Sequence, residues 1–466
     1  MAGAYLDQFL RRRSSQPIFV KETSRTATGQ PNYHTTNTPG VGSFYELVTV
    51  EPIDLSQSLN FSDITEIGDQ LLNMRSVLNY AERSDNSFEM LMKLSGAAGQ
   101  APDEDFMLEQ LFGKKTTYSG NFADHHGGGA NVSATEYSFA YSGGTFQIAQ
   151  IVDNYMLKVA NGSYCSGGSM EISREGAFST TFNTRSSQIR FAGSSLVTAI
   201  DDTAKTVTIT NGAYAVFPGM QFQLTNNDAQ VWDGATQAFA ASGSVLKVAS
   251  LNGDVATVTA DDGTVVDLAG VDSTTPGASW AADGVCVVPF IHTNDTDAAK
   301  VIANCGEVVP QGSASIFLGP KDTDMATLFA KTNGTDYDHQ FLGSAFSMTV
   351  EKNLGDPGVQ ELTGDIYPAP VYVAQDYSVT GSMSMIVRPK EAYRLNKALD
   401  DFEQSLAVVI APSTMSTRKI ILFMPRVRLS FSSQDIEGAE GANIDWMLTR
   451  PANCVDDSEV FKMVVI

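Results

Sequence analysis

The side chains that most often do chemistry are few in this sequence and lie far apart. Among 466 residues there are 5 histidines and 4 cysteines. His125 and His126 are adjacent, in the segment KKTTYSGNFADHHGGGANVS. Neighbouring residues of an extended chain point to opposite sides, and no cysteine or third histidine stands near enough to complete a ligand set. We therefore predict that this loop holds no metal ion.

Two other groups of residues are of types that bind metals or react in redox sites, but they lack the spacing of such sites. The cysteines, Cys165, Cys286, Cys305 and Cys454, lack the C-x-x-C spacing of zinc and redox sites, which favours free thiols in a reducing compartment. The acidic clusters DDG, from Asp261, and NDTD, from Asn294, lack the ligand spacing of a calcium loop. They are typical of solvated turns.

Catalytic motifs are also missing. The sequence has no serine-hydrolase elbow, no phosphate-binding glycine loop with its lysine, and no zinc-protease helix motif. We predict a protein that is not an enzyme, with no catalytic residue, no metal and no cofactor. A glycan hydrolase stays open as an alternative, because its two carboxylates need not be close in sequence.

The elements that position these side chains are clearest between Asp376 and Ala411. Apolar residues alternate with serine and threonine from Tyr377 to Val387, which predicts a strand with one buried face. Pro389 suits the first turn of a helix. An apolar stripe at helical spacing follows, made of Leu395, Leu399, Phe402 and Leu406. The run LAVVI then predicts a return to strand, before Pro412.

A similar module precedes it in the chain. Phe88, Met90, Met92 and Leu94 alternate with polar residues, and a helix that Asp103 could cap follows. The apolar stripe of that helix is Phe106, Leu108, Leu111 and Phe112. Each copy follows an apolar, acidic strand, FYELVTVEPIDL or FSMTVEKNL. This indicates two tandem copies of one α+β unit, although two unrelated strand-helix pieces would give the same pattern.

Composition predicts a mainly β (α+β) protein of about three domains. The chain is 42% hydrophobic and contains 39 glycines. We expect a polar, basic arm at 1–40, a first module at 41–192, an inserted all-β domain, barrel or sandwich, at 193–312, and a second module at 313–466. In the expected insert, aspartate is abundant while short alternating runs are separated by Asn-Gly and Asp-Gly turns.

Charge and hydropathy exclude two classes of protein. The net charge is −23, from 53 acidic and 30 basic residues, the reverse of what a phosphate-neutralising nucleic-acid binder needs. No apolar run approaches the roughly 20 residues that span a bilayer, and the first residues lack the order of a secretory signal. We predict no membrane segment, with assembly in a cytoplasm. Arg11, Arg12 and Arg13 make the arm basic, and we predict that they contact neighbouring subunits.

The phrases SGGSMEISREGAFSTTFNT and DYSVTGSMSMIVRPKEAYRLNKAL, in this order of strands and helix, resemble the major tail tube proteins of tailed bacteriophages. The resemblance covers the two modules. It implies tail-tube-like β-sandwich or barrel modules, each with a flanking helix and a long hairpin. Copies arranged in a ring place their hairpins side by side and make a β-lined tube. An insert in such a module would decorate the outside.

The function implied by the resemblance is structural. Stacked rings of this chain would form the tail tube of a virion, assembled in the host cytoplasm together with other tail proteins. DNA would pass through the lumen without tight binding, since an acidic wall repels phosphates. Two modules per chain predict a homo-oligomeric ring of three chains with pseudo-six-fold symmetry; six chains are the alternative. A capsid decoration protein or adhesin that binds through the insert remains a second hypothesis.

Overall fold

The computed structural model describes most of the chain, with gaps. The described residues are 17–22, 44–65, 74–94, 99–126, 131–140, 144–152, 156–173, 176–226, 228–261, 263–273, 284–290, 300–302, 307–310, 314–324, 340–355, 373–386, 403–411, 418–436, 439–451, 454 and 456–466. Arg11, Arg12 and Arg13, the predicted helix from Pro389 to Phe402, Cys305 and the NDTD cluster lie outside them. Leu406, the last residue predicted for the apolar stripe of that helix, lies instead in a strand, β26 (Glu403–Ile410).

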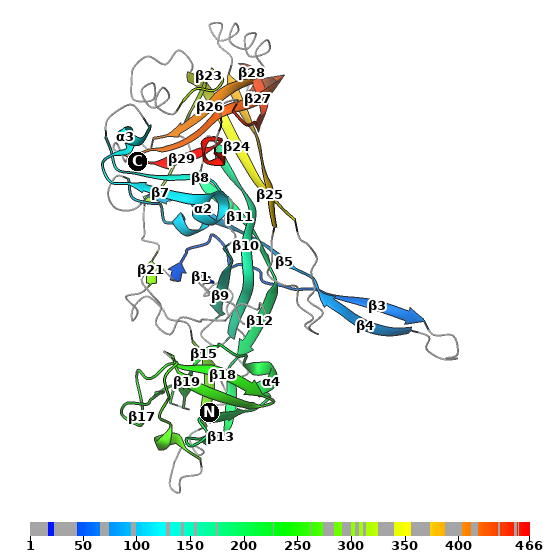
Figure 1. The fold of residues 1–466 in the computed structure, drawn as a ribbon, viewed down its shortest axis with the longest axis vertical. Coiled ribbons are helices and arrows are strands. Elements are labelled where there is room, and N and C mark those ends of the chain that lie inside the picture. The colour runs from blue at the N-terminus through cyan, green and yellow to red at the C-terminus, as the bar shows by residue number, and fades with distance from the viewer. Residues whose placement is uncertain are drawn as a thin grey trace.

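The prediction of a mainly β fold is confirmed, and most strands join in one closed barrel (Figure 1). The first half of the chain contributes β1 (Pro17–Lys21), β2 (Phe44–Glu46), β5 (Ser84–Leu91), β7 (Gly113–Tyr118), β8 (Ala134–Phe139), β9 (Phe146–Val152), β10 (Met156–Ser173), β11 (Ser179–Ser186) and β12 (Gln188–Gly193). The second half contributes β21 (Lys300–Ile302), β23 (Ala314–Pro320), β24 (Gln340–Gly355), β25 (Val373–Ile386), β26 (Glu403–Ile410), β27 (Ile420–Ile436), β28 (Ala439–Leu448) and β29 (Lys462–Val465).

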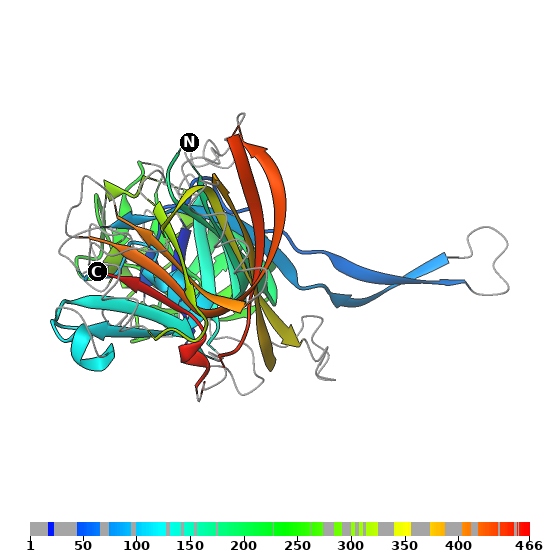
Figure 2. The ribbon, with the colours of Figure 1, turned by 90° about the horizontal axis from the view of Figure 1, so that it is seen from above.

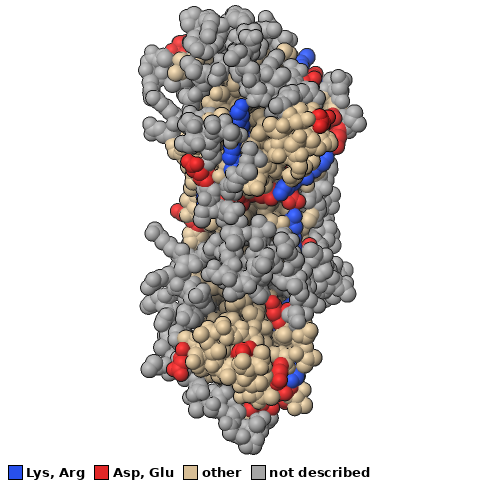
Figure 3. Space-filling view, turned by 90° about the vertical axis from the view of Figure 1, so that its left-hand side faces the viewer, with Lys and Arg blue, Asp and Glu red and all other residues tan. Residues whose placement is uncertain are grey.

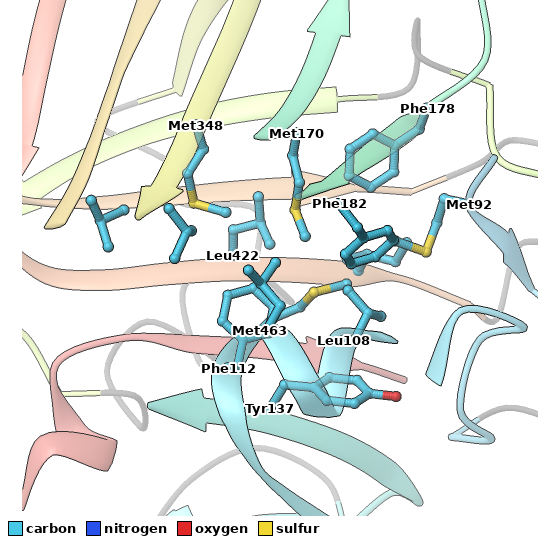
Figure 4. Close-up of a cluster of buried hydrophobic side chains, with 14 of the residues drawn as sticks. Met92, Leu108, Phe112, Tyr137, Met170, Phe178, Phe182, Met348, Leu422 and Met463 are labelled. Carbon is cyan, nitrogen blue, oxygen red and sulfur yellow. The ribbon is translucent and has the colours of Figure 1, made fainter. Parts of the chain in front are cut away.

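The two halves are joined by strand pairing. β10 and β24 run antiparallel, from Gly167 opposite Glu351 to Ser173 opposite Ala345. β29, the last strand, pairs with β8 of the first half. Apolar residues from both halves consequently share one core, in which Met170 and Met348 are neighbours (Figure 4). The division of the chain into two tandem modules, at 41–192 and 313–466, stays a prediction.

Helix α2 (Asp105–Phe112) lies in this core. Phe106, Leu108, Leu111 and Phe112, the stripe predicted from the sequence, are all buried. In the close-up, Leu108 and Phe112 point toward side chains of the surrounding strands (Figure 4). The predicted cap is wrong: Glu104 occupies the N-cap position, and no side chain caps the helix there.

Strand residues from the second half bind the other end of α2. The Lys352 ammonium donates to the carbonyl oxygen of Gln110, and the Tyr377 hydroxyl donates to that of Phe112 at 3.3 Å and to that of Ala140 at 2.8 Å. Carbonyls in the last turn of a helix have no partner within the helix, so these contacts satisfy groups that burial would otherwise penalise. Burial lowers the pKa of Lys352 to about 8.

The described residues between 195 and 289 form a second, smaller barrel. Its strands are β13 (Ser195–Asp201), β14 (Thr206–Ile209), β15 (Gln221–Thr225), β18 (Leu246–Asn252), β19 (Val255–Ala260) and β20 (Cys286–Pro289), and β15 pairs with β20 to close it. The hairpin β16 (Val231–Asp233) and β17 (Ala238–Ala240) extends it, and α4 (Gly212–Ala215) and the 3-10 turn η2 (Ala269–Val271) connect strands. Its core is continuous with Ile18, Val20, Leu157 and Val159 of the main barrel.

Three segments differ from the sequence analysis. β1 lies between β2 and β9 and is almost wholly buried, although its residues were expected in the polar arm. β21 pairs with β2, and β22 (Glu307–Val308) pairs with β6 (Lys93–Leu94), which attaches these residues to the main barrel although they fall in the range expected for the insert. The strand expected from Phe44 onward ends at Glu46.

One hairpin stands apart from both barrels. β3 (Leu59–Thr65) and β4 (Met74–Ala81) pair only with one another and project far from the body (Figures 1 and 2). The resemblance implies a long hairpin in each module, but no residue pattern placed one at these two strands. The remaining elements are α3 (Phe122–His126), after β7, and the 3-10 turn η5 (Asp457–Glu459), before β29.

Gly113 ends α2 and should tolerate no side chain. Its φ is 96°, its N–H donates to the carbonyl of Glu109, and a Cβ there would lie 1.9 Å from the Ala140 oxygen. Gly113→Ala is expected to lower the free energy of unfolding by about 2 kcal/mol or more, measured by urea denaturation. Gly120→Ala is the matched control, since its φ is 70° and no atom lies within 4 Å of the added Cβ. An equal loss in both variants would contradict the predicted clash.

Glu104 predicts a pH dependence of stability. Its side chain is 1% exposed, and burial raises its pKa to about 8 from an ordinary 4.5, although the Lys93 N–H donates to it. Between these values the unfolded chain is ionised there and the folded chain is protonated, so stability falls as pH rises. In Glu104→Gln the loss between pH 5 and pH 8, on the order of a few kcal/mol for this group, should shrink. An unchanged difference between the two pH values in urea denaturation would refute this.

Candidate functional site

Seven neighbouring strands of the main barrel present one broad outer face. They pair in the order β5, β11, β10, β24, β25, β28 and β27. Side chains alternate across a strand, so every second residue enters the core. Phe182, Met348 and Val379 do so. The alternate residues of the seven strands, whose side chains point away from the core, form what we call the hydroxyl-rich face.

Register places the residues of this face in rows across the strands. One row crosses all seven strands through the partners Leu91, Ser179, Glu171, Ser347, Ser382, Asp445 and Ser430. The next row crosses all seven and consists of Glu89, Thr181, Ser169, Thr349, Thr380, Met447 and Arg428. Small hydroxyl side chains therefore predominate, with acids among them, over a surface built from both halves of the chain.

The charge of the hydroxyl-rich face is mostly negative. Its acids include Asp85, Glu89, Glu171, Glu351, Asp376 and Asp445. Two arginines, Arg428 and Arg185, lie among them, and the Nε of Arg185 is 2.5 Å from a carboxylate oxygen of Asp85, directly opposite on β5. That pair is exposed and adds little stability, yet it compensates the arginine charge.

The hydroxyls of this face are arranged for hydrogen bonding rather than for nucleophilic attack. The Ser347 and Ser382 oxygens lie 2.9 Å apart, and the Ser382 N–H donates to the Ser347 oxygen at 3.1 Å. A serine nucleophile needs an adjacent base to take its proton, and the partners given for this pair are a second hydroxyl and backbone groups. The surface can bind water and repel anions.

A second polar group lies on the other side of the barrel, around His126. Its Nε2 is 2.7 Å from one Glu136 oxygen and 3.2 Å from the Tyr118 hydroxyl, and the Lys462 ammonium is 3.2 Å from the other Glu136 oxygen. Burial would raise the pKa of Glu136, but hydrogen bonds and charge from His126 and Lys462 lower it below its usual value. Burial beside this carboxylate raises the pKa of Tyr118 to about 12.

This cluster connects α3 and β29 to β8. The adjacent histidines His125 and His126 point in different directions there. His126 turns inward to Glu136, whereas His125 is exposed, with its Nε2 3.3 Å from the Asn121 side chain. Among the described residues, no group of three or more His, Cys, Asp or Glu side chains is placed to hold a metal ion. Cys165 and Cys286 are buried and Cys454 is partly exposed, all as free thiols.

The side that carries α3, β7 and β8 has no single sign of charge. Figure 3 shows basic and acidic groups interspersed over its main barrel, and several acidic groups on the smaller barrel below. No helix in the described part of the chain is both long and apolar enough to cross a membrane. The predicted inter-subunit residues Arg11, Arg12 and Arg13 cannot be related to either surface, since they precede the described residues.

Local sequence reasoning missed the hydroxyl-rich face as a unit. Its signal is present in each strand, as in Ser378, Thr380, Ser382 and Ser384, which alternate with core residues. The strands that assemble it come from distant parts of the chain, and their order follows from long-range pairing. Compared with models of known protein families and with curated proteins, the chain matches none.

Proposed function

We propose that this chain is a structural virion protein whose rings stack into a phage tail tube that conducts DNA. The observation that carries the proposal is the hydroxyl-rich face, a broad, polar and acidic β surface. Such a surface suits a wall past which a polyanion slides, because affinity for DNA arises when a protein neutralises phosphates. The resemblance to tail tube proteins supports the same function.

The width of the face favours three chains per ring over six. Adjacent strands lie about 4.8 Å apart, so three seven-stranded faces placed edge to edge enclose a channel on the order of 30 Å across. Six faces would double that diameter, which is more than a single DNA duplex requires. Since β5, β10 and β11 come from the first predicted module and β24, β25, β27 and β28 from the second, each chain would supply two pseudo-equivalent parts of the wall.

The assembled particle tests this proposal. Electron microscopy and native mass measurement of the purified protein should show rings or tubes with an axial channel, each ring containing three chains of 49.9 kDa. Six chains around the axis would exclude the trimer, and particles without a channel would exclude the tube.

Charge reversal on the hydroxyl-rich face should convert the wall into a DNA-binding surface. Assembled Glu351→Lys, Asp445→Lys protein is expected to bind duplex DNA at low salt, with affinity that falls steeply as salt rises. The matched control, Asp228→Lys with Asp267→Lys, makes the same charge change on the smaller barrel and should leave binding near the wild-type level. Fluorescence anisotropy of labelled DNA measures both; equal binding by the two variants would place the lumen elsewhere.

A binding role for the smaller barrel, as in a decoration protein or adhesin, is the second candidate. Two large apolar side chains there are strongly exposed, Tyr214 at 89% and Val265 at 78%. Apolar groups left in water at such exposure favour contact with a partner when they are contiguous. Monodisperse particles in the microscopy above would favour this function over the tube.

A further inference from the structure

One margin of the hydroxyl-rich face ends in a strand edge with which no further described strand pairs. β27 pairs with β26 and β29 through residues up to Arg428, and with β28 from Val427 to Ile436. From Leu429 to Ile436 no other described strand pairs with it. Exposed edges are usually protected by charged side chains, above all lysine, by proline or by short length. This stretch, LSFSSQDI, contains no lysine or proline, and its one charged residue is Asp435.

The β3–β4 hairpin also has strand edges with which no described strand pairs. Its two strands form a sheet of their own, so each has an edge that no described strand pairs with. A lone two-stranded hairpin is marginally stable in water and needs further strands or a packing surface. The strand sequences LNFSDIT and MRSVLNYA also lack proline and lysine.

The positions of these two features are those of a head-to-tail contact. β4 leads directly into β5, which forms the margin of the hydroxyl-rich face opposite to β27. The hairpin projects outward on the side of β25, β27 and β28, away from the body (Figure 2). A hairpin attached at one margin and a free edge at the other would join copies in a repeating contact, which closes into a ring when the rotation permits.

We propose that the β3–β4 hairpin of one copy adds its strands to the Leu429–Ile436 edge of the next copy. The lengths agree, since β3 has 7 residues and β4 has 8, and the free edge of β27 has eight positions between Leu429 and Ile436. Main-chain hydrogen bonds of this kind satisfy both edges and extend the sheet across the subunit boundary. With the two hairpin strands between neighbouring faces, a ring of three would enclose about 40 Å instead of about 30 Å. Only the closure of the copies into a ring rests on the proposed function, because the same contact could also join copies in an open chain.

Disulfide trapping tests the contact directly. Two single variants, Ser433→Cys on β27 and either Ser62→Cys or Ser76→Cys on the hairpin, are mixed, assembled and oxidised. Paired strands bring opposite Cβ atoms within disulfide range, so a covalent dimer containing one copy of each variant is expected. Thr236→Cys on the smaller barrel replaces the hairpin variant as control. Trapping no better than with this control, for both hairpin positions, overturns the proposal.

A shortened hairpin separates this contact from folding. Replacing residues 62–77 by Asn-Gly leaves a tight turn between Phe61 and Leu78, which are opposite one another in the native register. Thermal unfolding of the monomer should be unchanged, while assembly at the same concentration is lost; rings that still form would refute the contact. A trapped dimer in particles that have no axial channel would refute the tube but support the contact. Tubes in which no disulfide is trapped would support the tube but refute the contact.

Discussion

The antiparallel pairing of β10 with β24 is the interaction on which the rest of this structure depends. It connects strands that are far apart in the sequence, and through it β11 and β5 on one side and β25, β28 and β27 on the other become one sheet. The inner side chains of that sheet then enclose α2, while Lys352 and Tyr377 reach its last carbonyls. The outer face exists because the same alternation points serine, threonine and acids away from the core.

Much of the local structure could be predicted from residue pattern alone. The alternation around Val379, Met383 and Met385 identified core positions, and all three are buried. The stripe of α2 was equally clear. Patterns fail where the alternation changes within one strand: the core residues of the main barrel are even-numbered in Ile420–Met424 and odd-numbered in Val427–Phe431, yet both segments belong to β27. A local shift in its register with β26 changes the alternation there without ending the strand.

The candidate site was harder to predict for a physical reason. Rows on a sheet depend on which strands pair and in what register, and loop closure over long sequence separations leaves little trace in local composition. Ser347 and Ser382 meet because β24 and β25 are neighbours, which hydropathy does not encode. The β3–β4 hairpin was missed for a different reason: its strands pair with no other described strand, whereas the alternation that identifies strands comes from burying one face of a sheet. β1 was overlooked because the apolar run of Pro17–Val20 is short and surrounded by polar residues.

The smaller barrel is attached in a way that has consequences for inheritance. An inserted domain with a core of its own can be gained, lost or exchanged between lineages by recombination at its two ends. Here Ile18, Val20, Leu157 and Val159 of the main barrel complete the core of the smaller one, so a descendant that lost residues 195–289 would expose them to water. Its loss would have to be accompanied by substitutions in β1 and β10. The two barrels should therefore have diverged together, as one inherited unit.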